Sequence, residues 1–274
     1  MSPPTLSIVI VNYNARAHLE NCLESLAAAP PAIPHEIVVV DNASSDGSAA
    51  AVRARWPGVT IVEEPTNRGF AAGNNAGIRA GTGTLVLLLN NDTLVPAGAI
   101  DRLVGRLAEH PEAAVAGPRL VDADGIVELT FGPMMSPFAE LRQKIVMALH
   151  GLRVAPVSAW VERATRRERV VDWVSGACLL VRRAAAEQAG LLDERFFLYT
   201  EDVDFCAAIR RQGHRVLFTP AAEIVHLRGR SRATAPAAME HAYRRSHLAF
   251  YEKHHPRWVP LLRLYLRLKG RLPR

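Results

Sequence analysis

The chain has 274 residues, of which 49% are hydrophobic and 22% charged, a composition typical of a globular protein rather than a disordered or fibrous one. No apolar run approaches the roughly 20 residues that a membrane span needs. Three scattered cysteines without a C-x-x-C pair exclude a disulfide framework and a zinc finger. The N-terminus lacks the basic region of a secretory signal, so we expect a reducing, cytoplasmic compartment.

The net charge of +6 is distributed unevenly along the chain. From residue 228 to the end there are twelve Lys and Arg against two Glu, so the preceding body is mildly acidic. A basic tail predicts a negatively charged partner. The charge alone leaves open a membrane surface, a nucleic acid or a phosphorylated substrate.

The first third of the chain alternates between strand and helix signals. Short apolar runs predict strands at 6–11, 36–40, 60–63 and 84–89. Helices are predicted between them at 17–29, from about residue 47, and at 69–80. Apolar strands that alternate with helices are typical of an α/β fold with a mostly parallel sheet covered on both faces.

Polar clusters follow three of these strands, at 12–14, 41–46 and 90–92. The carboxyl ends of parallel strands meet at one edge of a sheet, and this is where such folds bind their ligands. We therefore expect the three clusters to share one site.

The alternation breaks after about residue 120. Residues 121–169 combine turn signals, an amphipathic piece and a basic run, and are expected to form an insertion or a mobile flap. The elements predicted beyond it are strand signals over 170–181, a helix near 201–212, strands at 215–219 and 223–227, and two helices at 237–254 and 258–269 that Pro256 separates.

Three carboxylates, Glu201, Asp202 and Asp204, gather at the predicted start of a helix. Mutual repulsion raises carboxylate pKa values, which is a common way to make a general base. A favourable interaction with the helix dipole is the alternative, and it explains one or two acids better than three.

Three further positions allow both a chemical and a structural interpretation. Asp92 ends a strand and suits a divalent cation that bridges a diphosphate, although Asn and Asp are also ordinary turn residues. Asp41 could accept a hydrogen bond from a ribose or a base, or cap the following helix. His226 is a metal ligand, a diphosphate contact or a structural histidine.

Several nucleotide-binding and hydrolytic motifs are absent. The chain has no G-x-G-x-x-G fingerprint, no G-x-x-x-x-G-K-[ST] loop and no G-x-S-x-G elbow. Dinucleotide oxidoreductases, P-loop NTPases and α/β-hydrolases therefore lose their main support.

Six segments in order resemble the inverting glycosyltransferases of family 2, in the bacterial rhamnosyltransferase-like branch. They are SIVIVNYN (7–14), VVVDNASSDGS (38–48), NRGFAAGNNAGI (67–78), LLLNNDT (87–93), SGACLLVRR (175–183), and LLDERFFLYTEDVDF continued to TPAAEIVHLRGRS (191–231). The resemblance implies a GT-A fold over 1–231, with a nucleotide-binding half to about 120 and an acceptor half from about 121. The remaining residues, 232–274, would be a basic helical extension.

The resemblance also implies roles for individual residues. Asp202 matches the catalytic base, and Glu201 would orient the acceptor or tune Asp202. The positions implied to bind the nucleotide sugar are Tyr13, Asp41, Arg68, Asn75, Asn91, Trp173 and Gly176. Asp92 matches the last position of the metal-binding D-x-D motif, with His226 as a helper and Mg²⁺ or Mn²⁺ as the cofactor. Asn90 stands where many relatives have the first Asp, which puts a strict metal requirement in doubt.

The resemblance implies a nucleoside-diphosphate sugar as the donor, with dTDP-rhamnose as the first candidate and a UDP-hexose as the second. The acceptor would be a glycan or a lipid-linked glycan of cell-wall or polysaccharide synthesis. No nucleic acid partner is expected. Residues 257–274 are either a packing helix with a solvated basic face or a segment that docks on the inner face of the plasma membrane. The question of whether the protein forms a homodimer stays open. The alternatives are a non-catalytic nucleotide-sugar scaffold and a sugar-1-phosphate nucleotidylyltransferase, which should have a glycine-rich basic motif where this chain has Asn12-Tyr13-Asn14.

Overall fold

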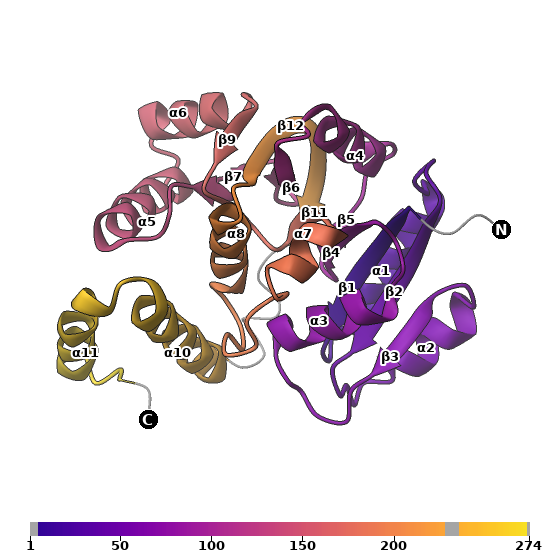
Figure 1. Cartoon of the computed structure of the whole chain (residues 1–274), viewed down its shortest axis with the longest axis horizontal. Helices are drawn as coiled ribbons and strands as arrows, with labels where there is room; N and C mark the ends of the chain where they lie inside the picture. The colour runs from indigo at the N-terminus through magenta and orange to yellow at the C-terminus, as the bar shows by residue number, and fades with distance from the viewer. Residues whose placement is uncertain (1–4, 228–235, 273–274) are drawn as a thin grey trace.

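The computed structural model describes residues 5–227 and 236–272. It confirms the α/β class: a ten-stranded sheet lies at the centre, with helices around it (Figure 1). The principal strands are, in spatial order, β3 (Thr60–Glu63), β2 (His35–Asp41), β1 (Leu6–Asn12), β4 (Leu85–Asn90), β11 (Cys178–Arg182), β6 (Ala113–Val121), β12 (Arg215–His226) and β5 (Thr93–Leu94).

The first half of the sheet is parallel, as the alternation predicted. β1 pairs in parallel with both β2 and β4, and β2 with β3. β11 then runs antiparallel between β4 and β6, and β12 is parallel to β6. The two strands predicted at 215–219 and 223–227 are one strand, β12, whose register shifts between Thr219 and Glu223. All seven residues of β1 are buried, because both faces of the sheet are covered.

Helices cover the two faces in sets of three. One face carries α1 (Arg16–Ala28), α2 (Ser48–Arg55) and α4 (Ala99–Glu109), and the other carries α3 (Phe70–Ala80), α7 (Arg183–Gln188) and α8 (Glu201–Arg211). Side chains alternate along a strand. Ile8 and Ile10 of β1 therefore pack with the first set, while Val9 packs with the second.

Two glycines bring α3 close to β1. A Cβ at Gly73 would lie 2.8 Å from Val11 Cγ1, and one at Gly77 would overlap with Val9. The short separation sets the beginning of α3 beside the carboxyl ends of β1 and β2, where the polar clusters lie.

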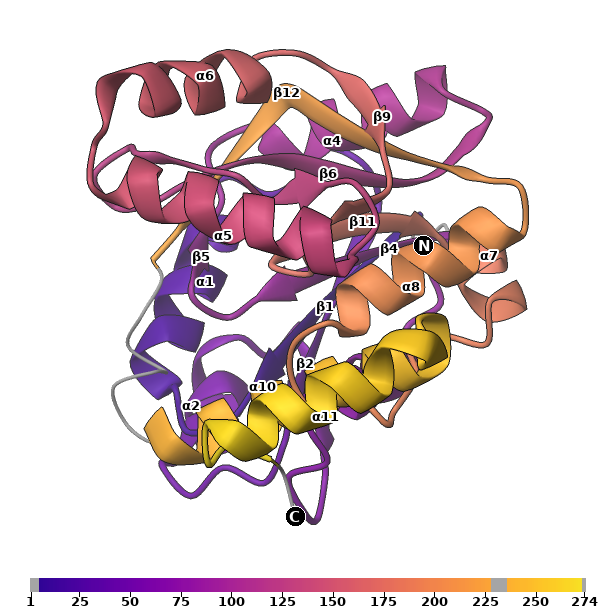
Figure 2. The ribbon, with the colours of Figure 1, turned by 90° about the vertical axis from the view of Figure 1, so that its left-hand side faces the viewer.

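The segment expected as an insertion has regular structure of its own. It contains the helices α5 (Pro137–Gly151) and α6 (Ala155–Thr165). Its short strands are β7 (Val127–Glu128), β8 (Phe131–Gly132) and β9 (Arg169–Val171), and β10 (Trp173–Val174), just beyond it, pairs with β8. The two helices lie on the face of the molecule that Figure 2 turns to the viewer.

The chain ends in α10 (Pro236–His254), a 3₁₀ turn (Pro256–Trp258) and α11 (Val259–Leu268), so the predicted break at Pro256 is confirmed. Phe250 and Tyr251 of α10 share an apolar cluster with Phe196 and with Val203 of α8. The predicted domain boundary at 231/232 lies outside the described residues. Among the described helices, none combines the length and the apolar character needed to cross a bilayer.

Candidate active site

The polar clusters after β1, β2 and β4 meet at one edge of the sheet. Asn12 is fully buried, and Asn91 Nδ2 donates to Asn12 Oδ1 at 2.8 Å. The strand order reverses at β1, between β2 and β4, and a crevice for ligands forms at such a reversal. The hydrogen bond between Asn12 and Asn91 ties the end of β1 to the residues that follow β4.

Asp41 has a carboxylate oxygen without a partner at this edge. The residue is 5% exposed, and its Oδ2 accepts the backbone N–H of Ser44 at 3.1 Å. Its Oδ1 has no hydrogen-bond partner in the described part of the chain. An unsatisfied buried acceptor is costly, so this oxygen is placed to take a donor from a ligand. Tyr13, the residue that follows β1, is half exposed.

A carboxylate–histidine–carboxylate row lies at the other side of the edge. His226, at the end of β12, has Nε2 3.3 Å from Asp92 Oδ1 and Nδ1 3.3 Å from Glu128 Oε2. The backbone holds the row in place, because Leu227 N–H donates to Asp92 O at 2.8 Å. Burial alone would lower the pKa of His226, but the two carboxylates outweigh it and raise the pKa to about 9. Burial alone would raise the pKa of Asp92, but the hydrogen bond and the charge of His226, together with smaller contributions, lower it.

The donor atoms here fit a divalent cation. His226 Nε2 and Asp92 Oδ1 face each other, and the buried Asn90 Oδ1 has no hydrogen-bond partner among the described residues. Glu128 on Nδ1 would fix the tautomer that presents Nε2 to a metal. No group of three or more His, Cys, Asp or Glu with metal-ligand geometry occurs in residues 5–227 and 236–272, so a cation here would need further ligands from a substrate or water.

Asp202 lies in the first turn of α8, beside the segment that follows β10. Its Oδ2 accepts the backbone N–H of Gly176 at 2.8 Å, and its Oδ1 accepts that of Val203 at 2.8 Å. Ala177 O in turn accepts Asn90 N–H at 2.9 Å, which links Asp202 to the end of β4. A Cβ at Gly176 would lie 3.3 Å from Asp202 Cβ, so a small residue is needed there.

The neighbouring acids of α8 have different environments. Burial, and then the charge of Asp202, raise the pKa of Glu201 well above its ordinary value. Burial also raises the pKa of Asp202, against the hydrogen bonds from Gly176 and Val203. Glu201 also has one buried carboxyl oxygen without a partner in the described chain.

Asp204, the third acid, is used structurally. Its Oδ2 accepts Lys253 Nζ at 2.8 Å, and its Oδ1 lies 2.6 Å from His254 Nε2, both on α10. These bonds tie α8 to α10.

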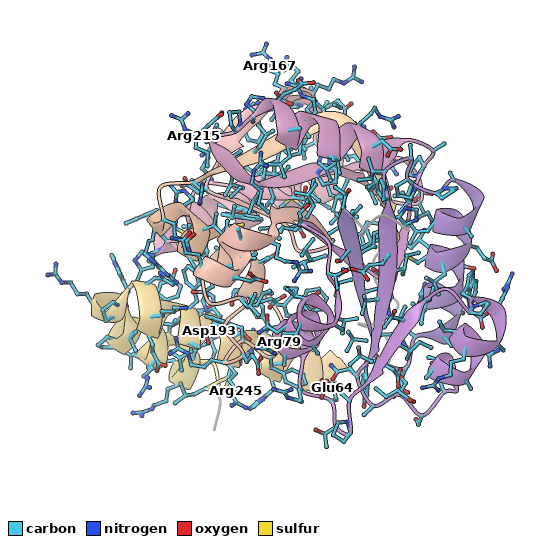
Figure 3. All side chains as sticks on the ribbon, turned by 45° about the vertical axis from the view of Figure 1, so that its right-hand side comes forward. Glu64, Arg79, Arg167, Asp193, Arg215 and Arg245 are labelled. Atoms are coloured by element: carbon cyan, nitrogen blue, oxygen red, sulfur yellow. The ribbon has the colours of Figure 1, made fainter. Side chains whose placement is uncertain are left out.

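Arg68 and Asn75 meet at one carboxylate. Arg68 Nη2 donates to Glu194 Oε2 at 2.6 Å, and Asn75 Nδ2 donates to Glu194 Oε1 at 3.0 Å. Asn75 is buried; its Nδ2 also donates to Leu192 O, and its Oδ1 accepts the backbone N–H of Leu192. Asn75 therefore holds the loop before α8. A pocket of about 350 Å³ borders this loop, with Asp193 and Arg79 on its wall (Figure 3). The roles of Arg68 and Asn75 toward a nucleotide stay predictions.

Gly176 contacts Asp202 directly, whereas Trp173 lies on the neighbouring strand β10, and the role of Trp173 toward a sugar stays a prediction. Trp173 Nε1 donates to Pro133 O at 2.9 Å, and its ring lies 3.2 Å from where a Cβ of Gly132 would be. The ring thus lies over the β8–β10 pair.

Sequence reasoning missed Glu128 and Glu194. Glu128 contacts His226 from 98 positions away in a segment expected as a flap. Glu194 lies within the segment LLDERFFLYTEDVDF, but the resemblance implied no role for it. A lone Glu in an irregular segment gives no spacing signal, so only the folded chain shows these contacts.

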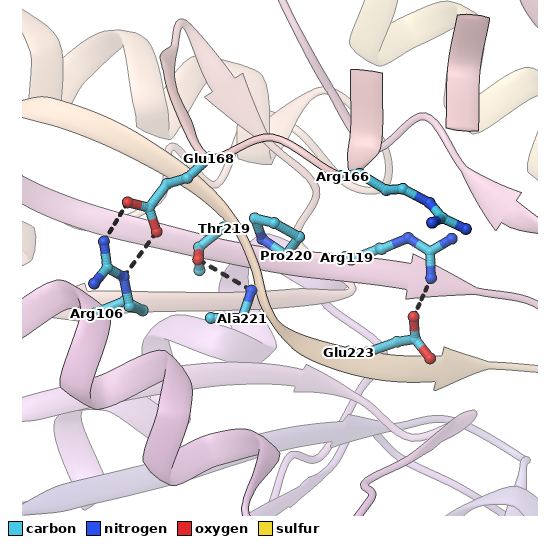
Figure 4. A pocket seen from close by; sticks show the side chains of 8 residues that line it. All are labelled: Arg106, Arg119, Arg166, Glu168, Thr219, Pro220, Ala221 and Glu223. Carbon is cyan, nitrogen blue, oxygen red and sulfur yellow. Dashed lines mark hydrogen bonds and ion pairs between the residues drawn. The ribbon is translucent and has the colours of Figure 1, made fainter. Parts of the chain in front are cut away.

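A second pocket, of about 670 Å³, lies away from this edge, at the bulge of β12 (Figure 4). Its arginines are neutralised by glutamates: Arg106 donates to Glu168 at 2.9 Å, and Arg119 pairs with Glu223. None of the site residues predicted from sequence lines it.

Comparison with known proteins decides the family. The family described as "Glycosyltransferase like family 2" matches residues 3–260. The chain belongs to glycosyltransferase family 2. It is 31% identical, over 92% of its length and 86% of the relative's, to the N-acetylglucosaminyl-diphospho-decaprenol L-rhamnosyltransferase of Mycobacterium tuberculosis. It is 26% identical to a low-salt glycan biosynthesis hexosyltransferase of Haloferax volcanii, over 81% of this chain and 66% of that one.

Solved glycosyltransferases share the fold of this family 2 member. The mannosyltransferase PcManGT of Pyrobaculum calidifontis, in complex with GDP-Man and Mn²⁺, superposes with a TM-score of 0.63 at 21% identity, covering 96% of this chain and 69% of that one. GalNAc-T7 with UDP, GalNAc and Mn²⁺ gives 0.61 at 17% identity, covering 82% and 43%. The GT-A fold and the assignment as a glycosyltransferase are thereby confirmed, and the nucleotidylyltransferase alternative is set aside.

Proposed function

We propose that this protein transfers a sugar from a nucleoside diphosphate to a hydroxyl of a lipid-linked glycan, with inversion at the anomeric carbon. Rhamnose is the first candidate for the sugar. The observation that carries the proposal is the half-buried carboxylate of Asp202, held by Gly176 beside the end of β4. A UDP-hexose is the second candidate donor. The rhamnosyltransferase relative, named for a diphospho-decaprenol substrate, supports a lipid-linked acceptor.

The reaction is a single displacement. Asp202 takes the proton of the acceptor hydroxyl, whose oxygen bonds to the anomeric carbon as the bond to the diphosphate oxygen breaks. The nucleoside diphosphate leaves from the opposite face, and Asp202 then loses its proton to solvent. Gly176 and Val203 fix the carboxylate's orientation.

Residues at the strand edge hold the donor. Asp41 Oδ1 accepts a hydrogen bond from the base or ribose, and Tyr13 lies against the base. Asp92 and His226, with Asn90 Oδ1 at hand, would hold Mg²⁺ or Mn²⁺. When bound, the cation would neutralise charge that develops on the leaving diphosphate.

The test is a calorimetric titration of the full chain with dTDP, UDP and NAD, each with and without Mn²⁺ or Mg²⁺. We expect dTDP or UDP to bind more tightly with metal, and NAD not to bind. If neither nucleoside diphosphate binds under any condition, the donor assignment is wrong and a non-catalytic scaffold becomes the better account.

A further inference from the structure

Two helices far apart in sequence expose apolar stripes on one side of the molecule. On α5 and on the 259–268 helix, exposed apolar residues recur at three- and four-residue spacing, which places them on one helix face. We call this surface the α5–α11 face; its side chains, between 39% and 79% exposed, are Phe138, Leu141, Ile145, Trp258, Leu261, Leu264, Tyr265 and Leu268.

The two stripes form one surface. The rings of Phe138 and Trp258 meet edge to face with centroids 6.2 Å apart, and both helices lie on the side turned to the viewer in Figure 2. Eight of the thirteen large exposed hydrophobic side chains in the described chain belong to this face. Such concentration on one side marks an interaction surface, whereas scattered apolar residues need no explanation.

The outer stripe of α11 is not needed to pack the helix. Leu266 is buried, and Val259 and Leu262 pack against the cluster of Phe250 and Tyr251 on α10. This division explains why the apolar positions of 258–269 do not form a single stripe in sequence. One set packs inward, and a second set faces solvent.

Cations without partners surround the exposed stripe. Arg257, Arg267 and Lys269 form no ion pair within the described residues, while Arg263 pairs with Glu252 at 2.6 Å. An apolar centre with free Lys and Arg beside it is complementary to an anionic lipid surface, where acyl chains take the apolar groups and headgroups take the cations.

We propose that the α5–α11 face docks on an anionic bilayer surface. The proposal rests on the proposed function in one respect: docking would bring the acceptor side of the cleft to the membrane that carries a lipid-linked acceptor. The α5–α11 face and Asp202 are linked through one apolar cluster, because the cluster on which α11 packs includes Val203, the residue next to Asp202. In addition, Glu140 of α5 accepts the hydroxyl of Tyr251 at 2.6 Å, so both helices are tied to α10.

The test is co-sedimentation of the full chain with equimolar phosphatidylglycerol–phosphatidylcholine vesicles, against pure phosphatidylcholine vesicles. We expect binding to the anionic vesicles that weakens in high salt. Leu261→Asp with Leu268→Asp should abolish it, and Arg267→Glu should weaken it by roughly 5-fold or more, the factor that corresponds to about 1 kcal/mol for a basic residue near the surface.

Two exposed residues outside the α5–α11 face serve as controls. Val170→Asp changes an apolar residue that is 50% exposed, and Arg167→Glu reverses an exposed cation; both variants should bind vesicles like the wild type. Nucleoside diphosphate binding by every variant shows that the fold is intact and separates this proposal from the proposed function. The proposal is overturned if the wild type ignores anionic vesicles, if the controls lose as much binding as the face variants, or if the wild type is a dimer that Leu261→Asp dissociates.

Discussion

The carboxylate of Asp202 has two features that a general base needs, a fixed direction and a raised pKa. Backbone N–H groups of Gly176 and Val203 fix it, and burial raises its pKa. The sequence located this acid through its cluster with Glu201 and Asp204. The cluster alone does not separate the three acids, and only the resemblance singles out Asp202. Their different partners come from distant segments, such as Lys253 against Asp204, and are visible only in the folded chain.

Glu128 is expected to orient His226 toward a metal. Glu128→Gln should weaken Mn²⁺ binding in the presence of dTDP by roughly 10- to 100-fold, since the carboxylate behind a histidine ligand fixes its tautomer and raises its basicity. Electron paramagnetic resonance of free Mn²⁺ measures this directly. Glu109→Gln, at the surface of α4, is the control. Equal Mn²⁺ affinity in Glu128→Gln and wild type would contradict this role.

His226 makes stability and metal binding depend on pH in opposite directions. Its pKa is raised from 6.5 to about 9 in the metal-free fold, so the stabilisation is fully present below about pH 6.5 and is lost as pH rises through about 9. Metal binding needs the neutral imidazole, so Mn²⁺ affinity should rise with pH up to about 9, roughly tenfold per unit.

Thermal unfolding with a chelator, at pH values from 6 to 10, tests the first part of this prediction. The melting temperature of the wild type should fall relative to that of His226→Asn as the pH rises from about 6.5 to about 9. Parallel curves for the two proteins would mean that His226 does not carry the effect.

At the scale of elements, the strands were predictable and the close contacts were not. Buried strands such as β1 appear as continuous apolar runs, and the clusters at their carboxyl ends follow from parallel topology. The meeting of α5 with the C-terminal helices depends on contacts such as Glu140–Tyr251, 111 positions apart, which have no local signal. The same holds for the placement of Glu128 on His226.

The packing of α3 on β1 gives a stability prediction with an internal control. Gly77→Ala places a methyl group against Val9 in the core, which should destabilise the fold by about 1–3 kcal/mol. Gly105→Ala, in α4, meets no atom within 4 Å and should stabilise by about 0.5–1 kcal/mol. Urea unfolding of both variants measures the two changes. Similar values for both would show that the contact at Gly77 is not tight.

At the scale of the whole molecule, the sheet edge, α8 and the C-terminal helices form a connected arrangement. α10 holds α8 through Asp204 while it supports α11. In the proposed function, the edge would bind the donor and α8 would supply the base.

The most direct test of the central claim compares the wild type with Asp202→Asn, using dTDP-rhamnose and an N-acetylglucosaminyl-diphospho-polyprenol acceptor. The account predicts a product of inverted anomeric configuration by nuclear magnetic resonance. It also predicts that Asp202→Asn lowers turnover by roughly 10²- to 10⁴-fold with dTDP binding nearly unchanged, while the exposed-turn control Asp124→Asn keeps its activity. If Asp202→Asn retains most of its turnover, or the product keeps the donor's configuration, Asp202 is not the base of an inverting transfer.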